Sequence, residues 1–144
     1  MKLPDGQVVE LLLVSGDDTL AVDFIAELEE RSTTNPVTHL KTFQAGIDIL
    51  ATASGRASSI VILDLRNAQR EGMRFLNEVH SRLPFREPVI FIIGAEDFEA
   101  EIMKDHARFI AGQLPETGAG AAFVEWAASM LAENWSFESS PQKN

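Results

Sequence analysis

The stretch Ile60-Val61-Ile62-Leu63-Asp64 predicts a buried strand that ends in a carboxylate. Four consecutive apolar residues are typical of a strand covered on both faces, as in a parallel sheet. In an open α/β sheet, the carboxyl ends of the strands form the edge at which ligands bind. The sequence therefore places Asp64 where a nucleophile, a metal ligand or a structural hydrogen-bond acceptor would lie.

Strand-like and helix-like runs alternate along the rest of the chain. Strands are predicted at Val8–Val14, near Val37–Phe43, at Ser59–Leu63, at Val89–Ile93 and at Phe109–Ala111. Apolar residues at helical spacing follow each of them, in the groups Leu20 to Leu28, Ile47 to Ala53, Gly72 to Leu83, Phe98 to Ile102, and Phe123 to Leu131. Five such units predict one doubly wound α/β domain over residues 1–135, and the polar residues 136–144 are predicted to be a disordered tail.

The composition argues against several classes of function. The chain has no cysteine, so thiol catalysis, thiolate metal sites and disulfides are excluded. The 22 acidic and 12 basic residues give a net charge of -10, which disfavours nucleic acid as a partner. His39, His80 and His106 lack metal-ligand spacing and are expected to be surface or structural residues. No signal peptide or membrane-length apolar run is present, so we expect a cytoplasmic protein without a membrane partner.

Acidic residues follow two of the predicted strands. Asp17 and Asp18 come after the first strand, and Asp64 ends the third. These strands can be neighbours at the point where the strand order reverses, so the three carboxylates can converge. Clustered carboxylates suit Mg²⁺, which is commonly held by one or two carboxylates plus water. Asp17 or Asp18 is equally expected as the N-cap of the following helix, and the two roles can coexist.

At these residues the chain resembles the receiver domains of bacterial two-component response regulators. The run Ile62-Leu63-Asp64-Leu65-Arg66-Asn67-Ala68-Gln69-Arg70-Glu71-Gly72-Met73 looks like the phospho-acceptor segment of that family. Three further segments look like its first strand, the glycine turn into its second helix and its fourth strand: Leu11–Val14, Gln44–Leu50 and Pro88–Ile92. The long second helix and Trp135 are similar to the small single-domain receivers of bacterial phytochrome systems. The resemblance implies a flavodoxin-like fold with strand order 2-1-3-4-5 and five helices.

The resemblance also implies roles for individual residues. Asp64 falls on the phospho-acceptor position. Asp64 and the backbone carbonyl of Arg66 fall on positions that would hold Mg²⁺, and Asp17 would replace the family's acid as the third ligand. The Arg66 side chain allows another interpretation, because it can pair with Asp64 or Asp17 and fill the space that a metal would take.

Three parts of the family's site differ in this sequence. The acid pair after the first strand is replaced by Ser15-Gly16, which displaces the nearest acids by one or two positions. The switch hydroxyl after the fourth strand falls on Ile93 or Gly94, and neither side chain contains oxygen. The Lys-Pro pair after the fifth strand falls within Gly112–Pro115, which has no lysine. Phosphoryl transfer depends on such charge-stabilising groups, so their loss predicts very slow turnover.

We therefore expect a receiver-like signalling domain that is not an enzyme and that acts through protein contacts. Its partner would be a histidine kinase, another signalling protein or a second copy of the chain, with Trp126 or Trp135 as a possible interface anchor. In this hypothesis the site is atypical, and the missing groups make phosphorylation of Asp64 doubtful. The first alternative is a working Mg²⁺-dependent acceptor phosphorylated on Asp64. The second is a flavodoxin-like domain that binds a small molecule, although no glycine-rich nucleotide motif is present.

Overall fold

The computed structural model describes residues 10–33, 35–52, 59–66, 68–82, 89–94 and 110–130. Five strands and four helices lie within these residues. In chain order they are β1 (Glu10–Val14), α1 (Asp18–Glu30), β2 (Val37–Leu40), α2 (Phe43–Thr52), β3 (Ser59–Asp64), α3 (Gln69–Arg82), β4 (Val89–Ile93), β5 (Ile110–Leu114) and α5 (Ala119–Met130). The predicted helix around Phe98 and Ile102, the predicted tail, His106 and Trp135 lie outside the described residues.

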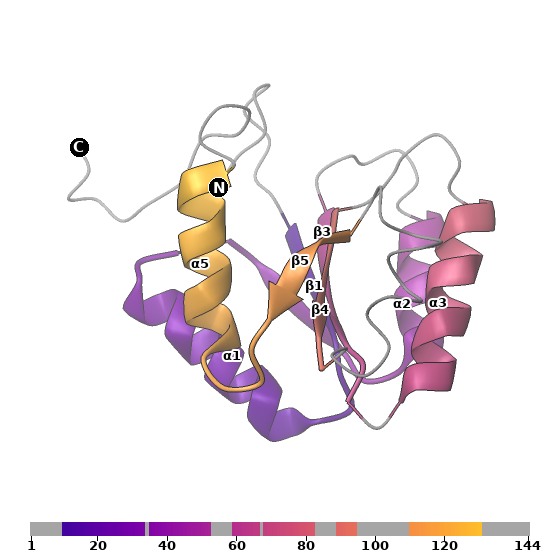
Figure 1. Cartoon of the computed structure of the whole chain (residues 1–144), viewed down its shortest axis with the longest axis horizontal. Helices are drawn as coiled ribbons and strands as arrows, with labels where there is room; N and C mark the ends of the chain where they lie inside the picture. The colour runs from indigo at the N-terminus through magenta and orange to yellow at the C-terminus, as the bar shows by residue number, and fades with distance from the viewer. Residues whose placement is uncertain are drawn as a thin grey trace.

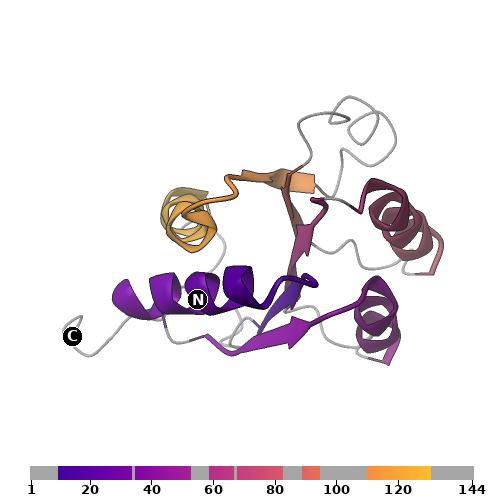
Figure 2. The same ribbon diagram turned by 90° about the horizontal axis from the view of Figure 1, so that it is seen from below.

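The strands form one parallel sheet in the order β2-β1-β3-β4-β5, which confirms the predicted sheet and its strand order. Helices α1 and α5 cover one face of the sheet, and α2 and α3 cover the other (Figures 1 and 2). The order reverses between β1 and β3, because the chain moves from β1 to one side for β2 and to the other side for β3. The carboxyl ends of β1 and β3 are therefore adjacent at the switch point of the sheet.

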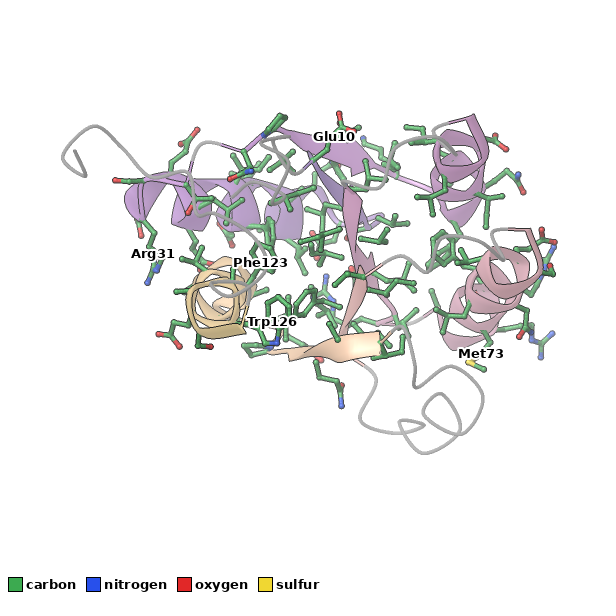
Figure 3. All side chains as sticks on the ribbon, turned by 90° about the horizontal axis from the view of Figure 1, so that it is seen from above. Glu10, Arg31, Met73, Phe123 and Trp126 are labelled. Atoms are coloured by element: carbon green, nitrogen blue, oxygen red, sulfur yellow. The ribbon has the colours of Figure 1, made fainter. Side chains whose placement is uncertain are left out.

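The strongly apolar central strands divide the core between the two faces. Alternate side chains of β1, β3 and β4 point to opposite faces, as the period of a strand requires. On the α1/α5 face, the Phe91 ring packs edge-on against Phe123 and Trp126, with centroid separations of 5.3 and 4.5 Å. Figure 3 shows Phe123 and Trp126 pointing from α5 toward the sheet. Trp126 is half-buried in this contact.

Three local predictions differ from the structure. The second strand ends at Leu40 instead of reaching Phe43, because Phe43 begins α2. The fifth strand extends to Leu114, beyond the predicted end at Ala111. Gly46 lies inside α2 and not in a turn, since its N–H donates to the carbonyl of Thr42 in the first helical turn.

Close packing explains the glycine at position 46. A Cβ atom there would lie 2.9 Å from Cε2 of Phe75 and 3.2 Å from Cγ2 of Val14. Helix α2 therefore approaches the sheet and α3 more closely than any residue with a side chain would allow.

Helices α1 and α5 meet at a second close contact, from which we predict the effect of a substitution at Gly120. The Glu27 carboxylate of α1 accepts hydrogen bonds from the N–H groups of Gly120 and Ala121, at 2.7 and 3.2 Å. A Cβ on Gly120 would lie 2.7 Å from the carbonyl oxygen of Phe24. Gly120→Ala should lower the free energy of unfolding by about 1–3 kcal/mol through overpacking, although alanine favours helix by about 1 kcal/mol.

Urea denaturation measures this effect, with Ser129→Ala on the exposed side of α5 as the control. The control should change the free energy of unfolding by less than about 0.5 kcal/mol. A Gly120→Ala protein more stable than the unsubstituted chain would contradict the close approach of the two helices.

Candidate functional site

The candidate site lies at the carboxyl edge of the sheet, where β1, β3 and β4 end side by side. Parallel pairing aligns Val14 with Leu63 and Asp64 with Ile93. The residues just after β1 therefore face the end of β3 across the switch point. Leu65, the residue after β3, donates its N–H to the carbonyl of Ile93 at 2.9 Å, which fastens the β3–α3 loop to β4.

Asp64 is buried, with 7% of its surface exposed, and hydrogen-bond donors surround its carboxylate. Oδ1 accepts from Nε of Arg66 at 2.9 Å and from the backbone N–H of Arg66 at 3.1 Å. Oδ2 accepts from NH2 of Arg66 at 2.9 Å and from the Ser15 hydroxyl at 2.6 Å. The guanidinium thus binds both carboxylate oxygens in the planar, two-point geometry that arginine favours with carboxylates.

Asp17 serves two roles at once. As the N-cap of α1, its Oδ1 accepts from the N–H groups of Thr19 and Leu20, at 2.9 and 3.2 Å. Its Oδ2 accepts from NH2 of Arg66 at 2.9 Å. One guanidinium therefore bridges Asp17 and Asp64, and the three charges sum to -1.

Asp18 does not join this group. Its carboxylate is exposed and lies 3.2 Å from Nζ of Lys41 in a surface ion pair. The structure therefore brings together two of the three acids that the sequence suggested, Asp17 and Asp64, and places the third elsewhere. The helix begins at Asp18, so the one-residue difference decides which carboxylate folds back as the cap.

The contacts within this cluster set its ionisation. Burial by itself raises the pKa of Asp64, but the hydrogen bonds from Arg66 and Ser15 and the charge of Arg66 outweigh it, so the pKa is lowered. The hydrogen bond from the Leu20 N–H, followed by that from Arg66, lowers the pKa of Asp17. The bonds to Asp64 raise the pKa of Arg66. All three groups are therefore charged near neutral pH.

The lowered pKa of Asp64 predicts how its contribution to stability changes with pH. A carboxyl whose pKa is depressed by folding stabilises the protein above its ordinary pKa, and this stabilisation is lost as pH falls through the folded value. Asp64→Asn should therefore lower the free energy of unfolding by about 2 kcal/mol at pH 7 and by much less in the acid range below the ordinary carboxyl pKa.

Urea denaturation as a function of pH tests this expectation. Asp23→Asn, at an exposed position of α1, is the matched control and should show a small difference at every pH. An Asp64→Asn deficit that stays constant down to the acid range would contradict the charged state of Asp64.

Ser15 and His39 belong to the site, although sequence reasoning gave neither a role in it. Ser15 is buried, and its Oγ donates to Asp64 while it accepts the N–H of Asp17 at 3.0 Å. Nε2 of His39, on β2, lies 2.8 Å from the carbonyl oxygen of Ser15. A hydroxyl residue directly after a strand next to the acidic strand is the sequence signal that points to Ser15.

The two positions that the resemblance assigned to a switch hydroxyl lie beside this cluster. Ile93 is buried and packs into the core on the α1/α5 face. Gly94 has a positive φ of 79°, which favours glycine, and its Cα lies against the side chain of Arg66. The strand β5 ends with Leu114, which is buried and directly precedes Pro115. These three positions therefore offer neither a hydroxyl nor an ammonium group to the site.

A cleft of about 360 Å³ opens beside the cluster, and Ser15, Asp17, Asp64 and Arg66 contribute to its wall. The resemblance to receiver domains implies Mg²⁺ at this edge, but the donor set does not suit it as arranged. Both carboxylates already bind a guanidinium, whose positive charge repels a second cation. Among the side chains that the structure describes, no group of three or more His, Asp or Glu residues is placed to hold a metal ion.

Comparisons with solved structures find the same fold in response-regulator receiver domains. The bacteriophytochrome response regulator RtBRR is 19% identical, with a TM-score of 0.70, over 94% of this chain and 86% of that one. A receiver domain from Rhodospirillum rubrum is 15% identical, with a TM-score of 0.68, over 92% and 99%. A signal receiver domain from Bermanella marisrubri is 18% identical, with a TM-score of 0.64, over 87% and 99%. The chain thus has the receiver fold.

No protein-family model matches the sequence, and no curated protein matches it significantly. Within the described residues, no helix is both long and apolar enough to cross a membrane.

Proposed function

We propose that this chain, which has the fold of response-regulator receiver domains, is a signalling domain that works by binding protein partners while its acceptor site stays closed. The observation that carries the proposal is the Arg66 guanidinium, which binds both oxygens of Asp64 and reaches Asp17. In this arrangement an internal cation partly neutralises the two acids that would otherwise attract an external one.

Electrostatics supports the closed site. A divalent cation would have to compete with three hydrogen bonds from the Arg66 guanidinium, two to Asp64 and one to Asp17. Phosphoryl transfer relies almost entirely on positioning and on stabilisation of charge by metal ions and cations. Ile93, Gly94 and Leu114, at the other family positions, have no polar side chain that could share this work.

We infer that the partner is a histidine kinase, another signalling protein or a second copy of the chain, and that the domain is cytoplasmic and not an enzyme. The names of structural neighbours support a signalling role, since one is a two-component response regulator from Legionella pneumophila. The strong negative charge of the chain supports a protein partner over nucleic acid.

A second candidate function is a working phospho-acceptor that uses Mg²⁺. The placement of Asp64 favours it, because the carboxylate ends β3 at the switch point and shares a cleft with Asp17. For this function Arg66 would have to leave both carboxylates.

Treatment with a small phosphodonor separates the two candidates. The full chain is incubated with acetyl phosphate, with and without Mg²⁺, and its intact mass is measured; Asp64→Asn is the matched control. The closed site predicts no gain of a phosphoryl group under either condition. A Mg²⁺-dependent gain that disappears in Asp64→Asn would overturn it in favour of the phospho-acceptor.

A further inference from the structure

The end of β4 lies directly against the side chain that closes the site. An ideal Cβ built on Gly94 would overlap Cγ of Arg66, and it would also lie 3.2 Å from the backbone nitrogen of Arg66. The hydrogen bond from the Leu65 N–H to the Ile93 carbonyl holds the two backbones together at this point. The Cγ atom of Arg66 thus has space only because residue 94 has no side chain.

The overlap falls on Cγ of Arg66, and this determines how a side chain at position 94 would affect the guanidinium. Cγ is the second carbon of the arginine side chain, so it moves only by rotation about the Cα–Cβ bond or by displacement of the backbone. Rotation to another staggered rotamer swings the whole guanidinium to a different direction. A side chain at position 94 would therefore remove the guanidinium from Asp64 and Asp17, not merely shift one atom of a flexible chain.

We infer that Gly94 is a positioning residue: it leaves the space in which the Arg66 side chain reaches the acceptor site. The lack of a switch hydroxyl at this position and the presence of the Arg66 guanidinium in the site are then one coupled feature. The inference rests on the proposed function, because it explains what keeps the site closed. It predicts that any side chain at position 94 opens the two carboxylates to a divalent cation, even while Arg66 is still present.

Gly118 provides a matched control for this inference. Its φ of 80° is almost the same as that of Gly94, but a Cβ there would meet no atom within 4 Å. Alanine at either position has a positive φ that alanine rarely adopts, but only alanine at position 94 meets Arg66, through both the Cγ of its side chain and its backbone. The difference between the two variants therefore reports the contact with Arg66, and the Arg66→Ala background separates the part of it that comes from the side chain.

The experiment titrates Mn²⁺ into the unsubstituted chain, Gly94→Ala, Gly118→Ala and Arg66→Ala by calorimetry. We expect Gly94→Ala and Arg66→Ala to bind Mn²⁺ at least about tenfold more tightly than the other two proteins, because the guanidinium charge has left the carboxylates. If Arg66→Ala gains Mn²⁺ binding and Gly94→Ala behaves like Gly118→Ala, the inference is wrong and the closed site stands. If the unsubstituted chain binds as tightly as Arg66→Ala, the proposed function itself fails.

A second measurement covers the case in which Gly94→Ala unfolds too readily for titration. The decrease in Tm caused by Gly94→Ala is measured in the unsubstituted chain and in an Arg66→Ala background, and the two values are compared. The overlap with Cγ is absent when residue 66 is alanine, so Gly94→Ala should lower the Tm less in that background than in the unsubstituted chain. An equal loss in both backgrounds would show that Gly94 does not act through Arg66.

Discussion

Replacing Arg66 by alanine should lower the free energy of unfolding by about 3 kcal/mol and should make the remaining stability depend on divalent cations. Among the described residues, the substitution leaves the buried carboxylate of Asp64 with the Ser15 hydroxyl and a backbone N–H as partners. It also removes the charge that separates Asp64 from Asp17. A bound cation at ten times its Kd would then restore about 1.4 kcal/mol.

Thermal and urea denaturation with and without Mg²⁺ measure both parts of this prediction. Arg70→Ala is the matched control, because Arg70 is exposed at the start of α3 and should change stability by less than about 0.5 kcal/mol. Adding Asp64→Asn to Arg66→Ala should recover part of the loss, since it removes the unpaired charge. An Arg66→Ala protein as stable as the control, with no response to Mg²⁺, would contradict the role of Arg66.

Replacing Phe91 by alanine should lower the free energy of unfolding by about 3–5 kcal/mol, which is the usual cost of emptying a large aromatic site in a core. Phe91 is fully buried in β4 and packs edge-on against two rings of α5, Phe123 and Trp126. The substitution should therefore loosen α5 and shift the emission of Trp126 toward longer wavelength.

Fluorescence during urea denaturation follows both effects in a Trp135→Phe background, in which Trp126 is the sole tryptophan. Phe43→Ala removes the same atoms from the opposite face, where the half-buried ring lies 6.0 Å from that of Phe75. It should cost less, about 1–2 kcal/mol, and should leave the Trp126 emission of the folded protein unchanged. Equal costs for the two substitutions would contradict the placement of Phe91 at the centre of the α1/α5 layer.

The architecture could be predicted because its central strands have the strongest signal that a parallel sheet produces. The apolar runs ending at Leu63 and Ile93 are buried on both faces, and the structure places them at the middle of the sheet. The edge strand β5 was predicted too short because Gly112 and Gln113 have low strand propensity. Gly112 lies next to the Phe91 ring, with a Cβ position 3.8 Å from it, and only the three-dimensional packing reveals this.

The sequence could show where the candidate site lies, but not how its side chains are arranged. Asp64 was placed correctly because a polar residue at the end of a buried strand is easy to recognise. Pairing of Arg66 with Asp64 or Asp17 was one of two open alternatives, and the structure has it binding both. The positive φ of Gly94 and its contact with Arg66 leave no mark in the residue pattern, so that part of the site could not be predicted.

The most direct test of the closed acceptor site is the Nε–H resonance of Arg66 in nitrogen-15 NMR spectra of the unsubstituted chain. This proton lies in the 2.9 Å hydrogen bond to Oδ1 of Asp64. Spectra are recorded before and after addition of Mg²⁺ and beryllofluoride, which mimics a phosphoryl group on an aspartate. A closed site predicts one protected Nε–H resonance that keeps its position in both spectra. Loss or displacement of that resonance when Mg²⁺ and beryllofluoride are added would contradict the account.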